Sequence, residues 1–253
     1  QTSQGLINMN LSAATSPASI SPMLRGLIMP FMFQSAAEFD EVIAKTDLLA
    51  KMNAPLLDSG LRLVAFNQRG LDAGIFVSTQ PVATLDYLAS LRMRALNKGQ
   101  VAFFQVMGVN STVVAWGEVA NALQTNIVDG YVNAPNSALR TGHTQYLKHY
   151  TPAALAPSLR AVMVSEDWWA DMSDEDRAAV TAAIEAGVAA NRAWVIEWGQ
   201  KVDAKFAEAG VTVTELAAGE RDKMLALAVA VHQKVLSEEA LADYAAAIGQ
   251  VRK

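Results

Sequence analysis

Residues 122 to 136 read ALQTNIVDGYVNAPN, and three local signals meet in this short stretch. A helix-like run ends near Gln124, an apolar strand-like run begins at Ile127, and an Asp-Gly pair and two asparagines follow. A helix that leads into a strand is the repeating unit of α/β proteins. Asparagines at a strand end are typical either of a turn or of a binding site. The stretch therefore leaves two interpretations open, a turn between packed elements or the wall of a site.

The same alternation continues along the chain. Strand-like runs rich in β-branched and apolar residues begin at positions 6, 61, 75, 91, 110, 127, 159 and 211. Helical patterns separate most of them, for example over 36–60, 100–108 and 117–125. With 253 residues, the chain can bury one large core or two modest ones. This order predicts an α/β fold with a largely parallel sheet.

One helix is expected to be unusually long. Ser173 can cap its start, with Asp176 at the third helical position, and Gly210 would end it. Apolar or small residues recur between them at spacings of three and four. About 36 residues at ~1.5 Å each give a rod of roughly 54 Å. Such a helix either touches two lobes, with Gly187 and Gly199 as candidate hinge positions, or lies on the surface of one domain.

A two-lobe arrangement divides the chain at two points. The run NQRGLDAG, between the strands that begin at 61 and 75, is where the chain would leave the first lobe. The strand that begins at 159 is where it would return. The predicted division is 1–74 plus 159–198 for lobe one and 75–158 plus 199–253 for lobe two.

Composition argues against several classes of function. The net charge of -5 gives no basic surface, which argues against nucleic acid as a partner. The chain has no cysteine, and its three histidines, His143, His149 and His232, lack metal-ligand spacing, so no metal or cofactor is predicted. No apolar run approaches the ~18 residues of a membrane helix. Known catalytic motifs are also missing, which argues against an enzyme.

Four polar or aromatic side chains stand at the ends of predicted strands, where ligands of open α/β sheets collect. Arg94 lies near the end of one strand and Asn97 follows it, Trp116 ends a second strand and Asn133 ends a third. An arginine, an aromatic ring and two amides can clamp a carboxylate, stack on a carbon skeleton and read hydroxyl groups. Each also has a structural interpretation, as a solvated arginine, a core tryptophan or turn asparagines. Together they predict a binding site and no catalytic centre.

Four segments, taken in order, resemble a known family. They are PFMF at 30–33, PVATLDYLASLRMRAL at 81–96, WGEVANALQTNIVDGYVNAPN at 116–136, and LKHYTPAAL ahead of a W-x-x-M-S-x-E-D helix start. Their order resembles the DctP-type solute-binding proteins of tripartite ATP-independent periplasmic (TRAP) transporters. The resemblance implies a two-lobe, periplasmic-binding-protein-like α/β fold with a long hinge-spanning helix. It further implies a periplasmic receptor, in mature form, that delivers a small organic acid to small and large membrane subunits.

The resemblance also assigns roles to residues. It implies that Arg94 pairs with the ligand carboxylate and that Asn133 lines the cleft. Trp116 falls on a position that is often aromatic, and Asn97 on a polar position three residues after the arginine. Ser16 would approach the cleft from lobe one.

The chain departs from the family pattern in three places. Phe76 stands where a second arginine is common, and the loss of that cation favours a monocarboxylate with an apolar or hydroxylated tail over a dicarboxylate. Val132 replaces an acid, and residues 88–91 read LASL in place of L-K-G-L. A strand-helix-strand segment on the order of 30 residues is expected ahead of QTSQGLINMN, and its loss would leave an unpaired sheet edge in lobe one.

Two alternatives to a transport receptor remain open at this point. A ligand-sensing domain of a signalling system can use the same lobes. An α/β enzyme is the weaker alternative, because it needs a nucleophile or general base at a strand end.

Overall fold

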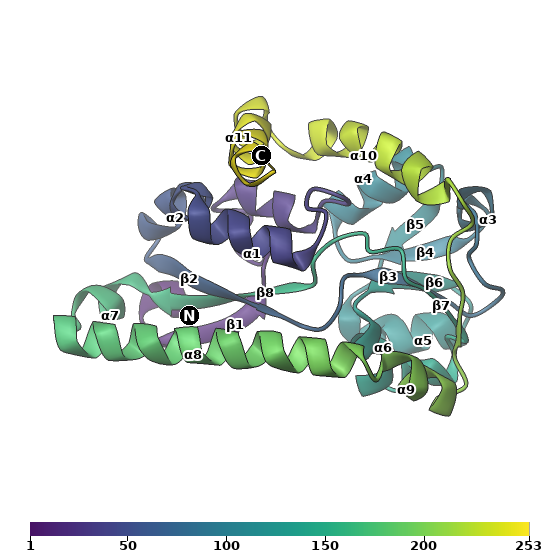
Figure 1. The fold of residues 1–253 in the computed structure, drawn as a ribbon, viewed down its shortest axis with the longest axis horizontal. Helices are drawn as coiled ribbons and strands as arrows, with labels where there is room; N and C mark the ends of the chain where they lie inside the picture. The colour runs from purple at the N-terminus through teal and green to yellow at the C-terminus, as the bar shows by residue number, and fades with distance from the viewer. Residues whose placement is uncertain (253) are drawn as a thin grey trace.

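The computed structural model describes residues 1–252 and contains two β-sheets surrounded by helices (Figure 1). Sheet A has three strands, in the order β1 (Met9–Ala13), β8 (Leu159–Ser165) and β2 (Leu61–Gln68). Sheet B has six strands, in the order β5 (Asn110–Val113), β4 (Arg92–Ala95), β6 (Gly130–Asn133), β3 (Gly74–Val77), β7 (His149–Thr151) and β9 (Thr212–Val213). The predicted mixed α/β class is confirmed.

The expectation of a largely parallel sheet is wrong. Both strand pairs of sheet A are antiparallel. In sheet B, β4 runs parallel to β5 and β6, and β7 runs parallel to β9, but β3 is antiparallel to both of its neighbours. The reason is that β2 leaves sheet A and continues into β3, whereas the chain returns from β7 to β8. The first crossover is residues 69–73 and the second is residues 152–158. Because they run side by side in opposite directions, β2 pairs antiparallel with β8 and β3 pairs antiparallel with β7.

The crossovers are hydrogen-bonded to each other along their length. The Arg69 amide donates to the Ser158 carbonyl oxygen at 2.8 Å, and the Ala73 amide donates to Ala156 at 2.9 Å. The Leu155 amide donates back to Ala73 at 2.8 Å. The two sheets are therefore joined by a narrow two-stranded connection rather than by a single linker.

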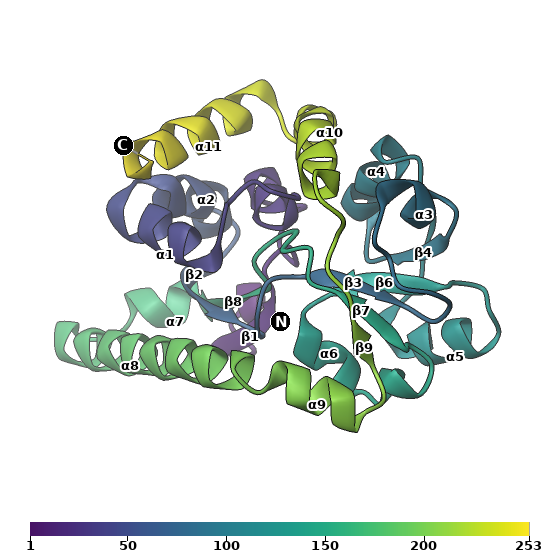
Figure 2. The ribbon, with the colours of Figure 1, turned by 45° about the vertical axis from the view of Figure 1, so that its right-hand side comes forward.

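Helices cover both sheets. Where the sequence suggested one helical segment over 36–60, the chain forms α1 (Ala36–Lys45) and α2 (Leu48–Leu57), separated at Thr46, whose backbone is extended. The C-terminal helix α11 (Glu238–Val251) packs against α1 and α2, and α10 (Glu220–Val235) packs against α3 (Leu85–Ala89) and α4 (Lys98–Val106) (Figure 2). The remaining short helices are η1 (Thr2–Gln4), η2 (Pro22–Ile28), η3 (Trp116–Glu118), α5 (Val119–Gln124), α6 (Pro135–Arg140), η4 (His143–Gln145) and α7 (Glu166–Ala170).

The long helix is shorter than its sequence pattern suggested. Helix α8 (Asp174–Gly199) has 26 residues, and α9 (Val202–Glu208) follows after a turn, so one uninterrupted helix up to Gly210 is wrong. The predicted cap is confirmed, because the Ser173 hydroxyl accepts the Asp176 amide at 3.1 Å. Helix α8 runs from beside sheet A to α9 beside sheet B (Figure 1). At its end, Gly199 lies against Leu71 of the first crossover, where a Cβ would approach Leu71 Cδ2 to 2.9 Å.

The division into two lobes remains a proposal. One unit contains sheet A (β1, β2 and β8) with α1, α2, α7 and α8. The other contains sheet B (β3 to β7 and β9) with α3 to α6 and α9. Because α11 packs on α1 and α2, we now assign residues 238–251 to lobe one in that proposal.

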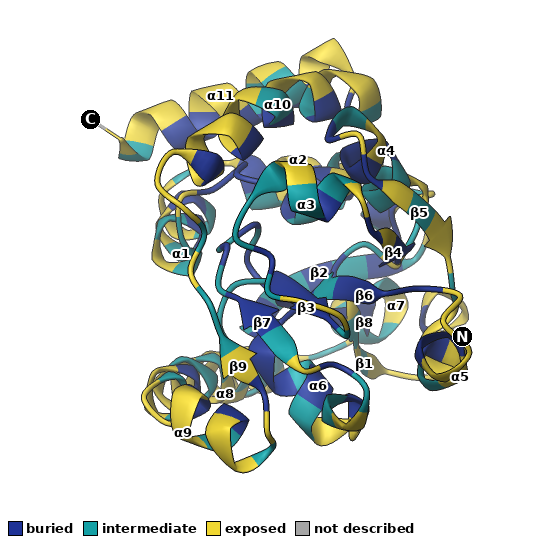
Figure 3. Ribbon diagram, turned by 90° about the vertical axis from the view of Figure 1, so that its right-hand side faces the viewer, coloured by how far each residue is buried: buried dark blue, intermediate teal, exposed yellow. Residues whose placement is uncertain are grey.

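Buried apolar side chains form two clusters on opposite faces of sheet B. Figure 3 shows the central strands of this sheet mainly as buried, and the helices around it as a mixture of buried and exposed residues. The larger cluster contains Ile75 and continues to the helices above sheet A. The smaller cluster contains Phe76, Tyr131 and Phe206. Successive strand residues face opposite sides, so Ile75 and Phe76 necessarily belong to different clusters.

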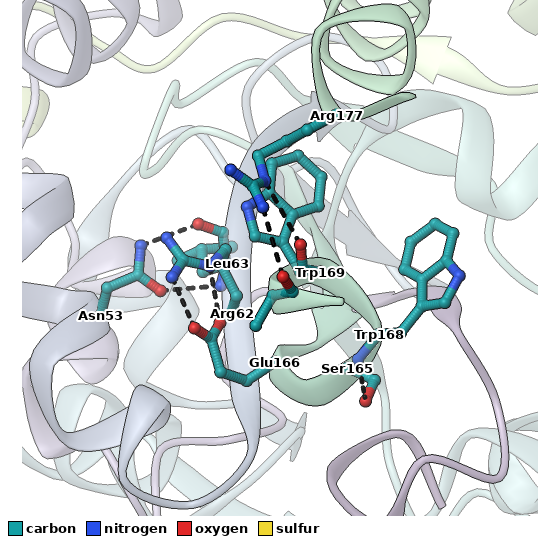
Figure 4. Close-up of polar contacts among 9 residues, drawn as sticks. Asn53, Arg62, Leu63, Ser165, Glu166, Trp168, Trp169 and Arg177 are labelled. Carbon is teal, nitrogen blue, oxygen red and sulfur yellow. Dashed lines mark hydrogen bonds and ion pairs between the residues drawn. The ribbon is translucent and has the colours of Figure 1, made fainter. Parts of the chain in front are cut away.

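Polar contacts hold the helices of lobe one against sheet A (Figure 4). Arg62 on β2 forms two hydrogen bonds of 2.6 Å to Glu166 on α7. The Asn53 side chain on α2 donates to the Leu63 carbonyl at 2.8 Å and accepts the Leu63 amide at 2.7 Å, beside the register shift of β2. Arg177 on α8 donates to the Met172 carbonyl at 3.0 Å. Within residues 1–252, no helix combines the length and apolar character that a membrane span requires.

Candidate functional site

A cavity of about 300 Å³ lies between the two sheets, beside the paired crossovers. Sheet A contributes Arg160 at the start of β8, and sheet B contributes Arg94 on β4 and Asn133 at the end of β6. The crossovers contribute Arg69 and Ser158. The remaining wall is mainly apolar, from the segments after β1, before α1 and around α4. The cavity is thus reached by side chains from both sheets.

Arg94 is buried, with 2% of its surface exposed, although it carries a charge. Its Nε donates to the Val114 carbonyl at 3.0 Å, and its guanidinium carbon lies 5.5 Å from the centre of the Trp116 ring. Burial lowers the pKa of Arg94, but an arginine remains protonated at neutral pH. Nη1 and Nη2 have no hydrogen-bond partner among the described residues. This terminal pair of nitrogens is free to bind a carboxylate.

An aromatic wall orients Arg94. The Trp116 ring lies 5.1 Å from the His143 ring and 5.8 Å from the Tyr131 ring, between centroids. The Tyr131 hydroxyl lies 3.3 Å from His143 Nδ1. Burial and then the charge of Arg94 lower the pKa of His143, so this imidazole is neutral at neutral pH. A neutral wall with a cation–π contact holds the guanidinium without neutralising it.

Asn133 lines the cavity and is 6% exposed. Its Oδ1 accepts three hydrogen bonds, from Arg69 Nη2 at 3.0 Å, from the Ala134 amide at 2.9 Å and from the Ser137 hydroxyl at 3.2 Å. The oxygen of this amide is therefore used to hold Arg69 and the start of α6. Its role as a ligand contact stays a prediction.

Two further arginines of the cavity were not predicted from the sequence. Arg69 donates from Nε to the Ser158 hydroxyl at 3.1 Å. Burial, and then the charges of Arg160 and Arg94, lower the pKa of Arg69 to about 10, so it too is charged at neutral pH. Arg160 donates from Nη1 to the Leu11 carbonyl at 3.4 Å. The only sequence signal was the position of Arg69 inside the short connection NQRGLDAG.

The PFMF segment forms another side of the cavity through Pro30. Phe31 has a φ of 55°, a conformation that costs energy for a bulky residue. Its amide donates to the Leu155 carbonyl at 2.7 Å, and the Arg221 guanidinium lies 4.9 Å from its ring centre. His232 Nε2 lies 2.8 Å from the Pro30 carbonyl oxygen. Contacts from α10 and from the second crossover thus hold this segment in place.

Asn97 and Ser16 do not line the cavity. The Asn97 side chain accepts the Gln100 amide at 3.1 Å and caps α4, which is the structural interpretation that the sequence left open. Ser16 is exposed, and the neighbouring residues Ala13 to Thr15 line the cavity instead. The tertiary structure therefore does not bring these two residues together with Arg94.

Phe76 is fully buried in the smaller core cluster and lies outside the cavity wall. In sheet B, Arg94 is opposite Tyr131, and Tyr131 is opposite Phe76, so a tyrosine separates the two positions. The Phe76 and Tyr131 rings lie 5.5 Å apart between centroids. The expectation of a monocarboxylate rested on a cation missing at position 76. Arg69 and Arg160, which that argument did not include, place two further cations in the cavity.

The Asp-Gly pair at 129–130 is structural. Asp129 accepts hydrogen bonds from the Arg92 amide at 2.8 Å and from its guanidinium at 3.0 and 2.6 Å. A Cβ at position 130 would lie 2.0 Å from the Phe76 carbonyl oxygen, so only glycine fits where β6 meets β3. Of the two interpretations that the sequence left open for this stretch, the structural one applies to this pair.

A cavity between two α/β units, walled by cations that lack carboxylate partners within the described chain, has the features of a binding site for small molecules. A family model described as bacterial extracellular solute-binding protein, family 7 (DctP), matches residues 1–239. The chain belongs to this family, and the resemblance to TRAP solute-binding proteins is confirmed.

Curated relatives agree with this assignment. A solute-binding protein of Sulfitobacter sp. (strain NAS-14.1) is 26% identical over 245 residues, which cover 96% of this chain and 73% of the relative. The 2,3-diketo-L-gulonate-binding periplasmic protein of Escherichia coli (strain K12) is 28% identical, over 83% of this chain and 63% of its own length. A solute-binding protein of Chromohalobacter salexigens is 26% identical, and the chain spans 58% of its length.

Solved structures share the fold. A TRAP periplasmic solute-binding protein from Ochrobactrum anthropi superposes with a TM-score of 0.88 at 24% identity, covering 99% of this chain and 79% of that one. A second, from Chromohalobacter salexigens with bound D-glucuronate, has a TM-score of 0.87 at 22% identity and covers 100% of this chain and 82% of that one. The two-lobe fold of these proteins is the fold of this chain.

Proposed function

We propose that this chain is a TRAP-transporter receptor that captures a small organic acid in the cavity between its two sheets. The observation that carries this proposal is the buried Arg94 side chain, which lines the cavity and whose two terminal nitrogens have no partner among residues 1–252. A planar guanidinium with two parallel donors matches a carboxylate. Removal of water from the closed cavity strengthens this contact.

Binding is coupled to closure because the cavity has walls from both sheets. A ligand that contacts Arg94 on sheet B and the β8 side of sheet A binds the closed arrangement more tightly than an open one. Only this difference in affinity shifts the population between the two states. The paired crossovers, the turn after Gly199 and the link between α10 and α11 connect the two sides, and we infer that the hinge lies in these segments.

The proposed ligand class agrees with the names of relatives. Proteins similar to this chain include receptors named for 2,3-diketo-L-gulonate, ectoine, sialic acid and C4-dicarboxylates. These ligands share a carboxylate, which is the group that Arg94 recognises. We further propose a periplasmic location and delivery to the small and large TRAP membrane subunits, in line with relatives named as periplasmic binding proteins.

A thermal-shift screen of small carboxylates and sugar acids tests the function. A ligand at 100 times its Kd stabilises the folded protein by ~2.7 kcal/mol, which gives a clear shift in Tm. We expect at least one carboxylate to raise Tm and its uncharged amide or alcohol analogue to leave Tm unchanged. A screen in which no carboxylate raises Tm, or in which the neutral analogues act equally well, would contradict the proposal.

A further inference from the structure

Three arginines from three different elements converge on the cavity. Arg94 lies on sheet B, Arg160 on sheet A, and Arg69 in the first crossover between them. No aspartate or glutamate lines this cavity, and none of the three arginines forms an ion pair within residues 1–252. Every one of them carries a positive charge at neutral pH. The cavity therefore holds an excess of three positive charges.

This arrangement is unfavourable without an anion. Like charges close together in a partly dry cavity repel each other. The protein nevertheless fixes the group in place through neutral acceptors, namely the Val114 carbonyl for Arg94 and the Ser158 and Asn133 side chains for Arg69. Acceptors without charge orient the guanidinium groups and leave their charge available. Uncompensated charge held by neutral partners is typical of a site for a charged ligand.

The three guanidinium groups reach the cavity from different parts of its wall. Arg94 lies against the Trp116 ring on the sheet B side of the cavity. Arg69 and Arg160 line both this cavity and a neighbouring one of about 540 Å³, as does Trp116, whereas Arg94 lines only the first of the two. Arg160 is also the least constrained of the three, with one long hydrogen bond of 3.4 Å to the Leu11 carbonyl. A side chain with so few contacts is free to turn toward a ligand.

We propose that Arg69 and Arg160 form a second anion-binding subsite, in addition to Arg94, which selects organic acids with two anionic groups over monoanions of the same size. This inference rests on the proposed function, since it requires that Arg94 binds the first carboxylate. One anionic group of the ligand binds the Arg94 guanidinium. The other binds between Arg69 and Arg160 and compensates the charges that otherwise repel each other. Because Arg160 belongs to sheet A, this second contact also favours closure.

Isothermal titration calorimetry on the full chain with matched ligand pairs tests the subsite. Each pair differs in one charge at nearly constant size: succinate against succinamate, and glucarate against glucuronate. The two pairs have different lengths, so they sample two separations of the anionic groups. We expect the dianion of at least one pair to bind at least tenfold more tightly than its monoanionic partner.

Substitution of Arg160 then locates the preference. We expect R160Q to weaken the dianion at least tenfold more than the monoanion, which removes the selectivity. R25Q is the matched control, because Arg25 is exposed and lies outside the cavity wall, and its substitution removes the same charge. The R25Q variant should keep the wild-type ratio of dianion affinity to monoanion affinity. R69K keeps the positive charge but loses the paired N–H donors of the guanidinium. It should reduce the ratio of dianion to monoanion affinity by a smaller factor than R160Q does.

The possible outcomes separate the two proposals. Equal affinities within both pairs, or equal losses for dianion and monoanion in R160Q, would overturn the second subsite and leave the carboxylate receptor intact. If neither carboxylate of either pair binds and the wider screen also fails, the receptor proposal itself falls. Circular dichroism of each variant establishes that a lost ratio reflects binding and not unfolding.

Discussion

Arg69 Nη2 donates to Asn133 Oδ1 at 3.0 Å, and this contact joins residues that are 64 positions apart. It connects the first crossover to the carboxyl end of β6, where the stretch ALQTNIVDGYVNAPN ends. The same oxygen accepts the Ala134 amide at 2.9 Å, so one amide caps a turn and orients a cavity arginine. The two interpretations of this stretch, turn and site wall, therefore describe the same side chain.

Arg94 and Arg92 provide a matched pair of substitutions on one strand. We expect R94Q to weaken carboxylate binding by roughly 100-fold or more, because two charge-assisted hydrogen bonds of roughly 1.5 to 3 kcal/mol each are lost. R92Q removes the same charge from an exposed side chain that pairs with Asp129 outside the cavity. Calorimetry with the best carboxylate of the screen should show near wild-type affinity for R92Q. Similar losses in both variants would contradict the assignment of Arg94.

Two substitutions of Asn133 test its contribution to stability and its contribution to anion binding separately. Asn133→Ala removes the acceptor of three hydrogen bonds and should lower the free energy of unfolding by about 1 to 3 kcal/mol. Asn133→Asp keeps the acceptors and costs less stability, but it places a negative charge beside Arg69. We expect the aspartate variant to bind anions at least tenfold more weakly than wild type, because like charges repel. Urea denaturation and calorimetry measure the two effects, and an aspartate variant with unchanged affinity would contradict this account.

Asp72 in the first crossover gives the protein a pH dependence. Burial raises the pKa of Asp72 to about 6, against the opposing charge of Arg221. The unfolded chain releases this proton near pH 3.8, so between pH 4 and 6 the folded state binds more protons and stability falls as pH rises. The loss is on the order of 2 kcal/mol.

Asp72→Asn removes this dependence. Denaturation at a series of pH values should show the variant gaining stability relative to wild type from pH 4 through pH 6, with the gain levelling off once the pH exceeds the folded-state pKa of about 6 by roughly one unit. Comparison with wild type at each pH cancels the contributions of other carboxylates, such as Glu38 and Asp129, whose pKa values are lowered by arginine partners. A constant difference across this range would show that Asp72 titrates normally.

Substitution of Asn53 tests how much its hydrogen bonds between α2 and β2 stabilise the fold (Figure 4). Its side chain exchanges two hydrogen bonds with the Leu63 backbone, at 2.8 and 2.7 Å. Asn53→Ala leaves a buried amide and carbonyl without partners, so we expect a loss of about 1 to 3 kcal/mol in the free energy of unfolding. Asn53 lies outside the cavity wall, and ligand affinity should stay the same. A loss below ~0.5 kcal/mol would mean that the register shift of β2 does not depend on this contact.

Much of the site was predictable because it depends on neighbours in sequence. The residues Arg94, Trp116 and Asn133 were found because strand ends and their polar successors are visible in the chain. Asn97 follows the same rule but caps α4, since a side chain beside a helix start can bond to the nearest free amide before any ligand does. Local pattern selects positions near a site and does not tell a ligand contact from a cap.

The sequence by itself determined the features that depend on a few consecutive residues: the Ser173 cap, most strand positions and the order of motifs that marks the family. Only the tertiary structure decided which sheet each strand joins and in which direction, because those choices depend on the two crossovers that run side by side. The same crossovers bring Arg69 and Arg160, 91 positions apart, to the cavity that contains Arg94. A charge cluster assembled from three elements has no periodicity or spacing along the chain, and its chemistry appears only when the elements pack.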